Sequence, residues 1–469
     1  MLEACRRSRP PRANIINITL SPAAYLVMIG VYLIHLREAL PMSEKIRNTL
    51  EGKEMFVFSI ATALLLFITA FLLAPPKELL HGMVTIVLTR DALVTDYFEL
   101  AGFGAAFFNA GLVLSLAILL IRLQKIPFTG LTMAVLFINA GFALFGKNPI
   151  NVLPMLLGTW LYARFHRAGM SRYIYTALFG SCLAPMVTEL VYLLPFSLAV
   201  NLGIAVIVGI FSGFVLPPLS VHTASMHMGY NLFNMGFAGG LFAFVMMCVL
   251  QSFGLESNNV FIWSYGRPFW LLAGLYLYFA AALLFGLYMN GKGIRSLLNL
   301  MRRPGRAVTD FVLMDGAPAT LVNMGIIGLL CTTYILLIGG DLSGPIVGAV
   351  LTAFGFAAFG VHAKNYLPVL AGVVLSTFFN HMQPTTPGIQ MGAVFAIGLA
   401  PIAGQFGILA GVIAGMLHAA VVVCSSSLYG GLNLYNNGFS TGLVAIVLVP
   451  ALESFIKGFR TKKEQKNRH

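Results

Sequence analysis

Gly141-Phe-Ala-Leu-Phe-Gly-Lys-Asn-Pro-Ile-Asn-Val-Leu-Pro-Met-Leu-Leu-Gly158 is the stretch that decides the fold of this chain, because a close copy follows 214 residues later. The copy reads Gly355-Phe-Ala-Ala-Phe-Gly-Val-His-Ala-Lys-Asn-Tyr-Leu-Pro-Val-Leu-Ala-Gly372, and ten of the eighteen positions are identical. The same order holds outward, where Val94-Thr-Asp-Tyr97 matches Val308-Thr-Asp-Phe311 and Asn231-Leu-Phe-Asn234 matches Asn433-Leu-Tyr-Asn436. The chain is therefore an internal duplication.

The composition of the 469 residues assigns the chain to the membrane proteins. Hydrophobic residues make up 58% and charged residues 10%, whereas soluble domains carry roughly 45–50% and about 25%. This excludes an ordinary soluble enzyme and a disordered scaffold. The net charge of +13 does not indicate nucleic acid binding, because the 29 basic residues lie mostly between apolar runs rather than in one cluster.

Fourteen apolar runs, seven in each half, are candidate membrane segments for a hydrocarbon core of roughly 30 Å. The first half contains 55–74, 105–121, 128–146, 150–165, 174–194, 199–216 and 231–250. The second half contains 269–288, 320–338, 342–360, 365–379, 391–403, 406–423 and 433–452. Several runs are short, which is typical of broken or re-entrant helices. We therefore predict an all-α membrane bundle of two repeats with about seven segments each, 12–14 in total.

The distribution of Lys and Arg predicts the orientation of the two repeats. With the C-terminal tail in the cytoplasm and the sides alternating, inner segments from Met42 onward hold twenty basic residues and outer segments hold four. This is the asymmetry of the positive-inside rule. Seven is an odd number, so the second repeat is inverted relative to the first. We expect a multi-pass protein of the inner membrane in contact with the lipid bilayer.

Four parts of the chain follow from these patterns. We assign residues 42–266 to the first repeat, 267–456 to the second, inverted repeat, and 457–469 to a basic cytoplasmic tail. Residues 1–41 fit neither repeat: they form an interfacial helix, or the natural start is Met42 and this extension is not native, which we favour. Oligomerisation of the protein with itself remains open.

The final segments of the repeats carry the best candidates for a solute pathway. Hydroxyl and amide side chains lie here beside aromatic rings, which suits a small polar or weakly anionic solute selected by diameter and hydrogen bonding. The alternative is hydrogen bonding between packed helices. The candidates are Ser225, Asn231 and Asn234 in the first repeat, with Ser427, Asn433 and Asn436 in the second.

Asn109 and Asn323 occupy matching Asn-x-Gly patterns. We expect them to open half-helices within the membrane, whose free N–H groups face the solute. The alternative is that they are helix caps and points of close packing.

Few ionisable residues lie within the apolar runs, and a charge at such a place is costly. Glu189, His222 and His227 are therefore candidates for proton coupling, although Glu189 could instead pair with a base and the histidines could be structural. Asp96 and Asp310 match across the repeats and predict helix caps. Lys147 and His362 lie just before the Asn-x-Leu-Pro motifs and are candidates for sensing an anion.

Motifs for catalysis, phosphate binding or a metal site are missing from the sequence. We therefore predict no enzyme activity, no cofactor, no metal and no nucleic acid partner.

Two resemblances follow from the quoted motifs. The duplicated Gly-Phe-Ala-x-Phe-Gly…Asn-x-Leu-Pro blocks and Asn433–Ser440 resemble a bacterial and archaeal family of internally duplicated polytopic membrane proteins of unknown function. A much weaker resemblance, carried by 108–112 and 229–231, is to urea transporters, but their proline is missing and seven segments exceed their five. Neither resemblance supplies a substrate.

The prediction is therefore a transporter or channel whose pathway lies at the interface of two inverted repeats. A membrane-embedded subunit of a larger, ATPase-driven transport complex is the first alternative. A membrane enzyme that modifies lipids is the less favoured one.

Overall fold

The computed structural model describes residues 52–91, 94–256, 261–289, 294–379 and 382–466, which belong to one compact unit beginning at Met42. The predictions for residues 1–41 lie outside the described residues.

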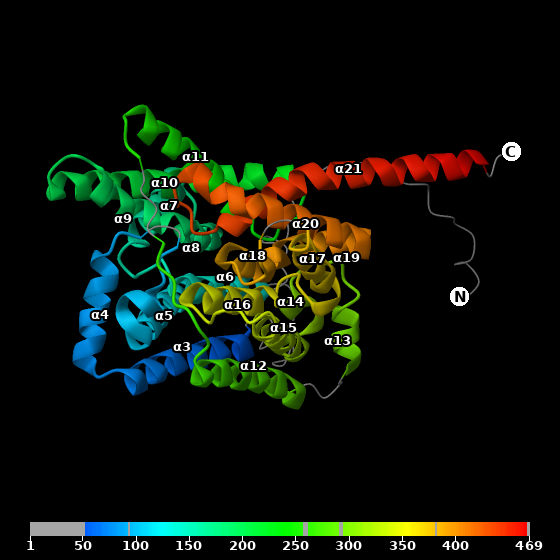
Figure 1. The fold of residues 1–469 in the computed structure, drawn as a ribbon, viewed down its shortest axis with the longest axis horizontal. Coiled ribbons are helices and arrows are strands. Elements are labelled where there is room, and N and C mark those ends of the chain that lie inside the picture. The colour runs from blue at the N-terminus through cyan, green and yellow to red at the C-terminus, as the bar shows by residue number, and fades with distance from the viewer. Residues whose placement is uncertain (1–51, 92–93, 257–260, 290–293, 380–381, 467–469) are drawn as a thin grey trace, which may run out of the picture. The chain divides into compact units, whose positions relative to one another are not determined.

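Every predicted apolar run contains a helix in the structure (Figure 1). The first repeat contains α3 (Lys53–Leu73), α4 (Pro76–Leu88), α5 (Tyr97–Leu123), α6 (Gly130–Phe142), α7 (Leu153–Phe165), η1 (Met170–Arg172), α8 (Ile174–Gly180), η2 (Ser181–Leu183), α9 (Ala184–Leu193), α10 (Leu198–Met226) and α11 (Asn234–Ser252). The second contains α12 (Phe269–Met289), α13 (Ile294–Leu300), α14 (Phe311–Asp315), α15 (Ala317–Leu337), α16 (Gly344–Phe356), α17 (Ala363–Ser376), α18 (Pro387–Phe395), η3 (Ala396–Leu399), α19 (Ala400–Phe406), α20 (Ile408–Ser425), η4 (Ser426–Tyr429) and α21 (Asn436–Lys466).

Ten helical segments in the described part of the chain are long and apolar enough to cross a membrane, five in each repeat. The remaining four of the fourteen predicted segments are α6, α7, α16 and α17, which have only 13 or 14 residues. Such a helix is about 20 Å long, against a hydrocarbon core of roughly 30 Å. The prediction of a polytopic bundle with some broken segments is confirmed.

The two repeats share their irregularities as well as their helices. In the first repeat, α5 is kinked at Gly102, where φ is 81°. The chain breaks at the matching Gly316 between α14 and α15, where φ is 89°. Only glycine adopts such angles without strain. Each repeat has an odd number of segments, whether the short ones are counted or not, so the second begins on the opposite side and is inverted.

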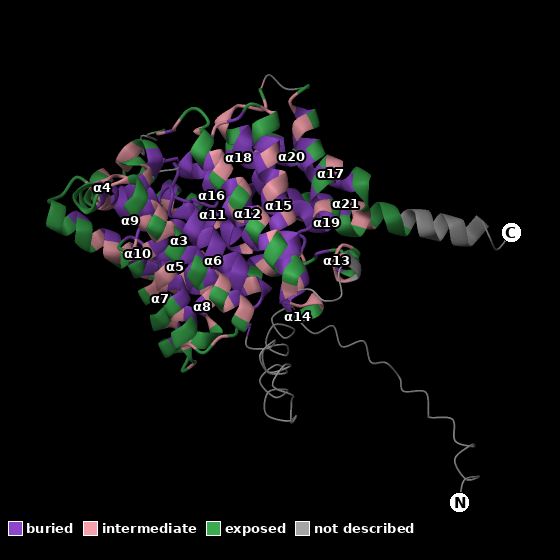
Figure 2. Ribbon diagram, turned by 90° about the horizontal axis from the view of Figure 1, so that it is seen from below, coloured by how far each residue is buried: buried purple, intermediate pink, exposed green. Residues whose placement is uncertain are grey.

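The short helices α6 and α16 pack against each other as an antiparallel pair at the interface of the repeats. A Cβ atom on Gly141 would lie 2.3 Å from the Gly348 oxygen, and one on Gly348 would lie 2.3 Å from the Gly141 oxygen. The glycines therefore permit backbone contact between the two helices. Every residue of α16 and all but one residue of α6 are buried, whereas α3, α10 and α12 expose apolar side chains (Figure 2). Their apolar outer surface contacts the lipid bilayer.

Two aspartates connect the repeats by capping helices of both. Asp310 accepts a hydrogen bond from Leu313 N (3.1 Å) in α14, and others from Gly130 N (2.9 Å) and Leu131 N (3.1 Å) at the start of α6. These contacts confirm the predicted cap and extend it to the other repeat.

Asp96 repeats this arrangement from the first repeat. It accepts from Phe98 N (2.9 Å) in α5, from Ser264 N (2.9 Å), and from Gly344 N (3.1 Å) at the start of α16. The starts of α6 and α16 therefore each receive an acceptor from the opposite repeat, beside their own caps Thr129 and Ser343.

Candidate functional site

Asn231 and Asn433 meet across the interface where the starts of α11 and α21 pack together. Asn231 Nδ2 donates to Gly438 O (3.3 Å), and Asn433 Nδ2 donates to Gly236 O (3.2 Å). Their Oδ1 atoms accept from Phe233 N and Tyr435 N. Both side chains therefore bind the backbone of the opposite repeat, and the protein itself occupies their polar atoms.

Asn234 and Asn436 are the first residues of α11 and α21, and each binds the preceding helix of its own repeat. Asn234 Oδ1 lies 2.9 Å from His227 Nε2 and accepts from Thr223 Oγ1 (2.8 Å). Asn436 Oδ1 accepts from Ser425 Oγ (2.8 Å) and from the Tyr429 hydroxyl. These four predicted pathway residues form a symmetric polar layer at the repeat interface, in which Asn231, Asn433 and Asn436 are buried and Asn234 is partly buried.

The prediction that Asn109 and Asn323 open half-helices is wrong. Both lie inside the long helices α5 and α15, where their Nδ2 atoms bind the end of the neighbouring short helix. Asn109 donates to Ala143 O and Lys147 O, each at 2.7 Å, and Asn323 donates to the two matching carbonyls at the same distances. The physical role is to satisfy carbonyls that a helix C-terminus leaves without a partner.

Ser225, Ser427 and His222 are exposed and are not part of this polar layer. Ser225 donates to His222 O (2.6 Å) and Ser427 to Cys424 O (2.7 Å), which are local bonds near helix ends. The structure therefore brings together the asparagines of the layer with His227 but leaves these three residues apart from them.

Glu189 is buried in the middle of α9 and forms a two-pronged ion pair with Arg90, with both N–O distances at 2.5 Å. The sequence had left open whether this carboxylate serves proton coupling or pairs with a base, and the structure contains that base.

A second buried carboxylate, Asp91, follows Arg90 in the chain. Its oxygens accept from Tyr97 OH (2.8 Å), Asn151 Nδ2 (3.2 Å) and Thr188 Oγ1 (3.4 Å). Burial in this neutral setting raises the pKa of Asp91 to about 7, although the three hydrogen bonds oppose the shift. Asp91 therefore titrates near neutral pH.

Lys147 lies at the turn after α6, and its side chain is fully buried. Its ammonium donates to Asn139 Oδ1 (3.0 Å), Ser181 Oγ (2.8 Å) and Tyr435 OH (2.5 Å). Among the described residues, no carboxylate forms an ion pair with it. Burial among neutral partners lowers the pKa of Lys147 to about 7.

Lys147 and its buried polar neighbours form a cluster whose equivalent positions in the other repeat are apolar. The turn after α16 has the same carbonyl–asparagine bonds as the turn after α6, yet it carries Val361 where the first carries Lys147. All the buried polar side chains in question have apolar counterparts. The pairs are Lys147 with Val361, Asn139 with Ala353, Ser181 with Ile397, Tyr435 with Phe233, Asn437 with Met235 and His418 with Leu216. This position-by-position comparison is the sequence signal that identifies the cluster.

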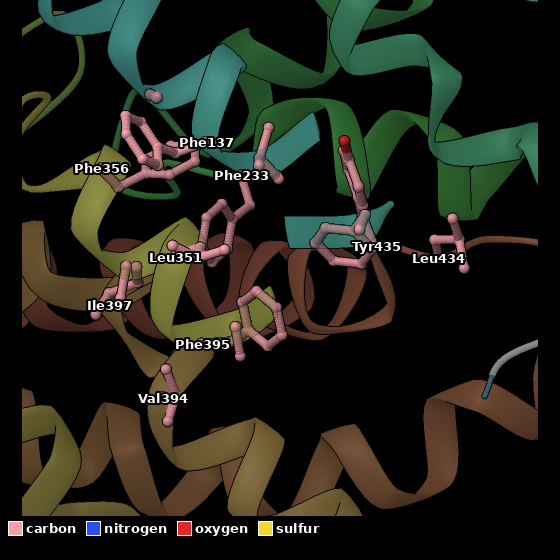
Figure 3. Close-up of a cluster of buried hydrophobic side chains, with 14 of the residues drawn as sticks. Phe137, Phe233, Leu351, Phe356, Val394, Phe395, Ile397, Leu434 and Tyr435 are labelled. Carbon is pink, nitrogen blue, oxygen red and sulfur yellow. The ribbon is translucent and has the colours of Figure 1, made fainter. Parts of the chain in front are cut away.

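A narrow cavity lies beside Lys147 at the repeat interface. Phe142, Phe233, Phe395, Tyr435 and Asn437 line it, and Figure 3 shows three of these rings among the buried apolar side chains. The volume open to the centre of a water molecule is about 10 Å³, which is enough for one water molecule.

Two buried polar groups near this cavity lack partners among the described residues: Asn437 Oδ1 and both ring nitrogens of His418. A larger cleft at the Gly102 kink has about 270 Å³ on the same measure. Residues of α3, α4 and α5 line it together with Trp270 of α12, and none of them is an unpartnered buried polar group, so we place the candidate site in the smaller cavity.

No group of three or more His, Cys, Asp or Glu within the described ranges could hold a metal ion.

Comparisons with known proteins give one result. No curated protein and no solved structure matches the chain, so the weaker resemblance to urea transporters gains no support. A family model described as "Protein of unknown function (DUF1576)" matches residues 75–252 and 289–454, which cover most of both repeats. The chain is therefore a member of this DUF1576 family of membrane proteins, as the first resemblance predicted.

Proposed function

We propose that this protein is a transporter or channel for a small polar or weakly anionic solute. The observation that carries the proposal is the interface between the inverted repeats, where a cavity lies between the short helix α6 of the first repeat and the helices α18 and α21 of the second. In many transporters the solute pathway lies at such an interface and is built from interrupted helices.

The cavity offers both parts of a selective site. Its aromatic walls restrict diameter, and we propose that the Tyr435 hydroxyl and the Asn437 amide, which belong to two of the lining residues, turn toward a solute that has lost its water. The described structure is a closed state, because the cavity admits one water-sized sphere. Solute passage therefore requires the repeats to move relative to each other.

Charge distribution supports the remaining parts of the proposal. The excess of Lys and Arg on one side of the alternating segments favours an inner-membrane protein with a cytoplasmic C-terminus. We further propose that the chain acts on the solute without chemical change, so it is not an enzyme.

The test is swelling and uptake in proteoliposomes with urea, ammonium, short-chain acids and amino acids. The decisive variant is Asn437→Met, which places at this position the residue that Met235 supplies in the other repeat. Met235→Leu is the matched control, since it preserves volume at the equivalent buried position. We expect saturable flux that falls in Asn437→Met and persists in Met235→Leu.

Absence of flux for every solute, with and without a proton gradient, would overturn the proposal. Stoichiometric co-purification of a second protein would then favour a subunit of a larger transport complex.

A further inference from the structure

We propose that the interfacial cavity binds a small monovalent anion, which accepts hydrogen bonds from Tyr435 and Asn437 and whose charge is balanced by Lys147. This inference rests on the proposed function, because it names the class of solute. It begins with the Lys147 ammonium, which is fully buried and has three neutral acceptors as its partners. Burial without a counter-charge lowers the pKa of Lys147 to about 7, and an anion bound nearby would favour the charged form of this side chain.

Tyr435 connects the ammonium to the cavity. Its hydroxyl oxygen accepts from Lys147 Nζ at 2.5 Å, and its ring lines the cavity. The hydroxyl proton has no acceptor among the described residues, so it is free to donate. A donor polarised by a neighbouring cation forms a stronger bond to an anion than a neutral hydroxyl does.

Asn437 supplies the second contact on the cavity wall. Its side chain is 6% exposed, and its Oδ1 lies near the His418 ring without a well-formed hydrogen bond to any described residue. Oxygen and nitrogen of an amide exchange places by a simple flip, which would turn the NH2 group toward an anion. A buried amide left without its bond is costly, so a ligand would stabilise it.

The symmetry-related position at the repeat interface, formed by Val361 of the second repeat with Phe233 and Met235 of the first, packs without these polar groups. The same backbone setting holds Val361, Phe233 and Met235 where Lys147, Tyr435 and Asn437 occur. An apolar set satisfies the packing there without any buried charge. The polar set is therefore best explained by a ligand, and the cavity, which has room for one water molecule in this closed form, limits that ligand to a small ion.

The experiment measures anion binding directly, on the full chain in detergent. Sodium fluoride, chloride, formate and nitrate are titrated against sodium gluconate at constant ionic strength, and the thermal unfolding midpoint is recorded. A ligand that binds only the folded state raises this midpoint as its concentration passes the Kd. We expect at least one of the four anions to give a saturable rise.

The variants exchange each polar residue for its counterpart in the other repeat: Lys147→Val, Tyr435→Phe and Asn437→Met. Lys147→Val should abolish the rise, and Tyr435→Phe should weaken apparent affinity by roughly tenfold to a hundredfold, the loss expected for one charge-assisted hydrogen bond. Val361→Ala, in the equivalent turn, is the control and should keep the rise. If Lys147→Val does not fold, Tyr435→Phe and Asn437→Met decide the result.

A rise that persists unchanged in Lys147→Val or in both milder variants would overturn the inference, as would no rise in the wild type. Flux of a neutral solute without any anion effect would refute the inference but retain the proposed function. Anion binding that depends on Lys147, in a protein with no flux, would support the inference and refute the proposed function.

Discussion

Replacing Asp310 by alanine should destabilise both repeats at once, because this carboxylate caps helices of each. Its removal leaves the N–H groups of Gly130, Leu131 and Leu313 without their acceptor. Each buried group that loses its partner costs about 1–3 kcal/mol, so after partial relaxation we expect a loss of roughly 3–6 kcal/mol.

The variant Asp310→Asn gives a finer test of the same geometry. Oδ1 accepts two of the three bonds and Oδ2 accepts one. An asparagine whose carbonyl oxygen occupies the Oδ1 position keeps two bonds and loses the third. The expected cost is about 1–3 kcal/mol, well below that of alanine.

The assay is unfolding in mixed SDS micelles, followed by circular dichroism and converted to a free energy of unfolding. Glu99→Ala is the control, since Glu99 is an exposed carboxylate in the first turn of α5. Asp96→Ala should resemble Asp310→Ala, because it removes an acceptor from three N–H groups in the same arrangement. If Asp310→Ala lowers the free energy of unfolding no more than Glu99→Ala does, the reasoning about shared caps is refuted.

Three further predictions concern packing and charge. Gly141→Ala should lower the free energy of unfolding by about 1–3 kcal/mol, because its Cβ would lie 2.3 Å from a backbone oxygen of α16. Gly274→Ala, where a Cβ meets nothing within 4 Å, should be neutral or slightly stabilising. Equal free energies of unfolding for the two variants would contradict this. The Asp91 pKa of about 7 exceeds its unfolded value, so the stability of the folded state should fall by a few kcal/mol as pH rises from about 4 to about 7. In a pH series of unfolding midpoints, Asp91→Asn should flatten this profile. An unchanged profile would disprove the assignment. Arg90→Met should lower the free energy of unfolding by about 3–5 kcal/mol, because it leaves a buried carboxylate without this cation. In the same assay this loss should be larger than that of Glu189→Gln, which leaves a partly exposed guanidinium. If Glu189 couples protons, Glu189→Gln should also abolish concentrative uptake, and normal accumulation would exclude that role.

The sequence predicted the segments well because apolar runs and internal copies are local and countable. All fourteen runs contain helices, and the duplicated Gly-Phe-Ala-x-Phe-Gly block marks the end of α6 and of α16. Helix length was harder to predict, since apolar turns extend the runs beyond the 13 residues that are helical in α6.

Most side-chain partners could not be predicted from the sequence. Asn109 looked like a helix start because Asn and Gly are common there, but its partners lie 34 and 38 residues away at the end of α6. Asp96 was predicted to cap its own helix, yet its bond to Gly344 spans 248 residues. The sequence predicts Lys147 as a candidate for sensing an anion but not where its side chain points. That direction depends on Ser181 and Tyr435, which come close to Lys147 only when the two repeats pack together.

The exchanged caps impose an order on the biosynthesis of the protein. The start of α6 obtains its acceptor from Asp310, which the ribosome adds 180 residues after Gly130. At roughly 5–20 residues per second, this interval lasts about 10–40 s. Throughout it the N–H groups of Gly130 and Leu131 at the start of α6 lack this acceptor, which the early second repeat then supplies. The first half of the chain therefore depends on the second in time as well as in space, and the two halves mature together.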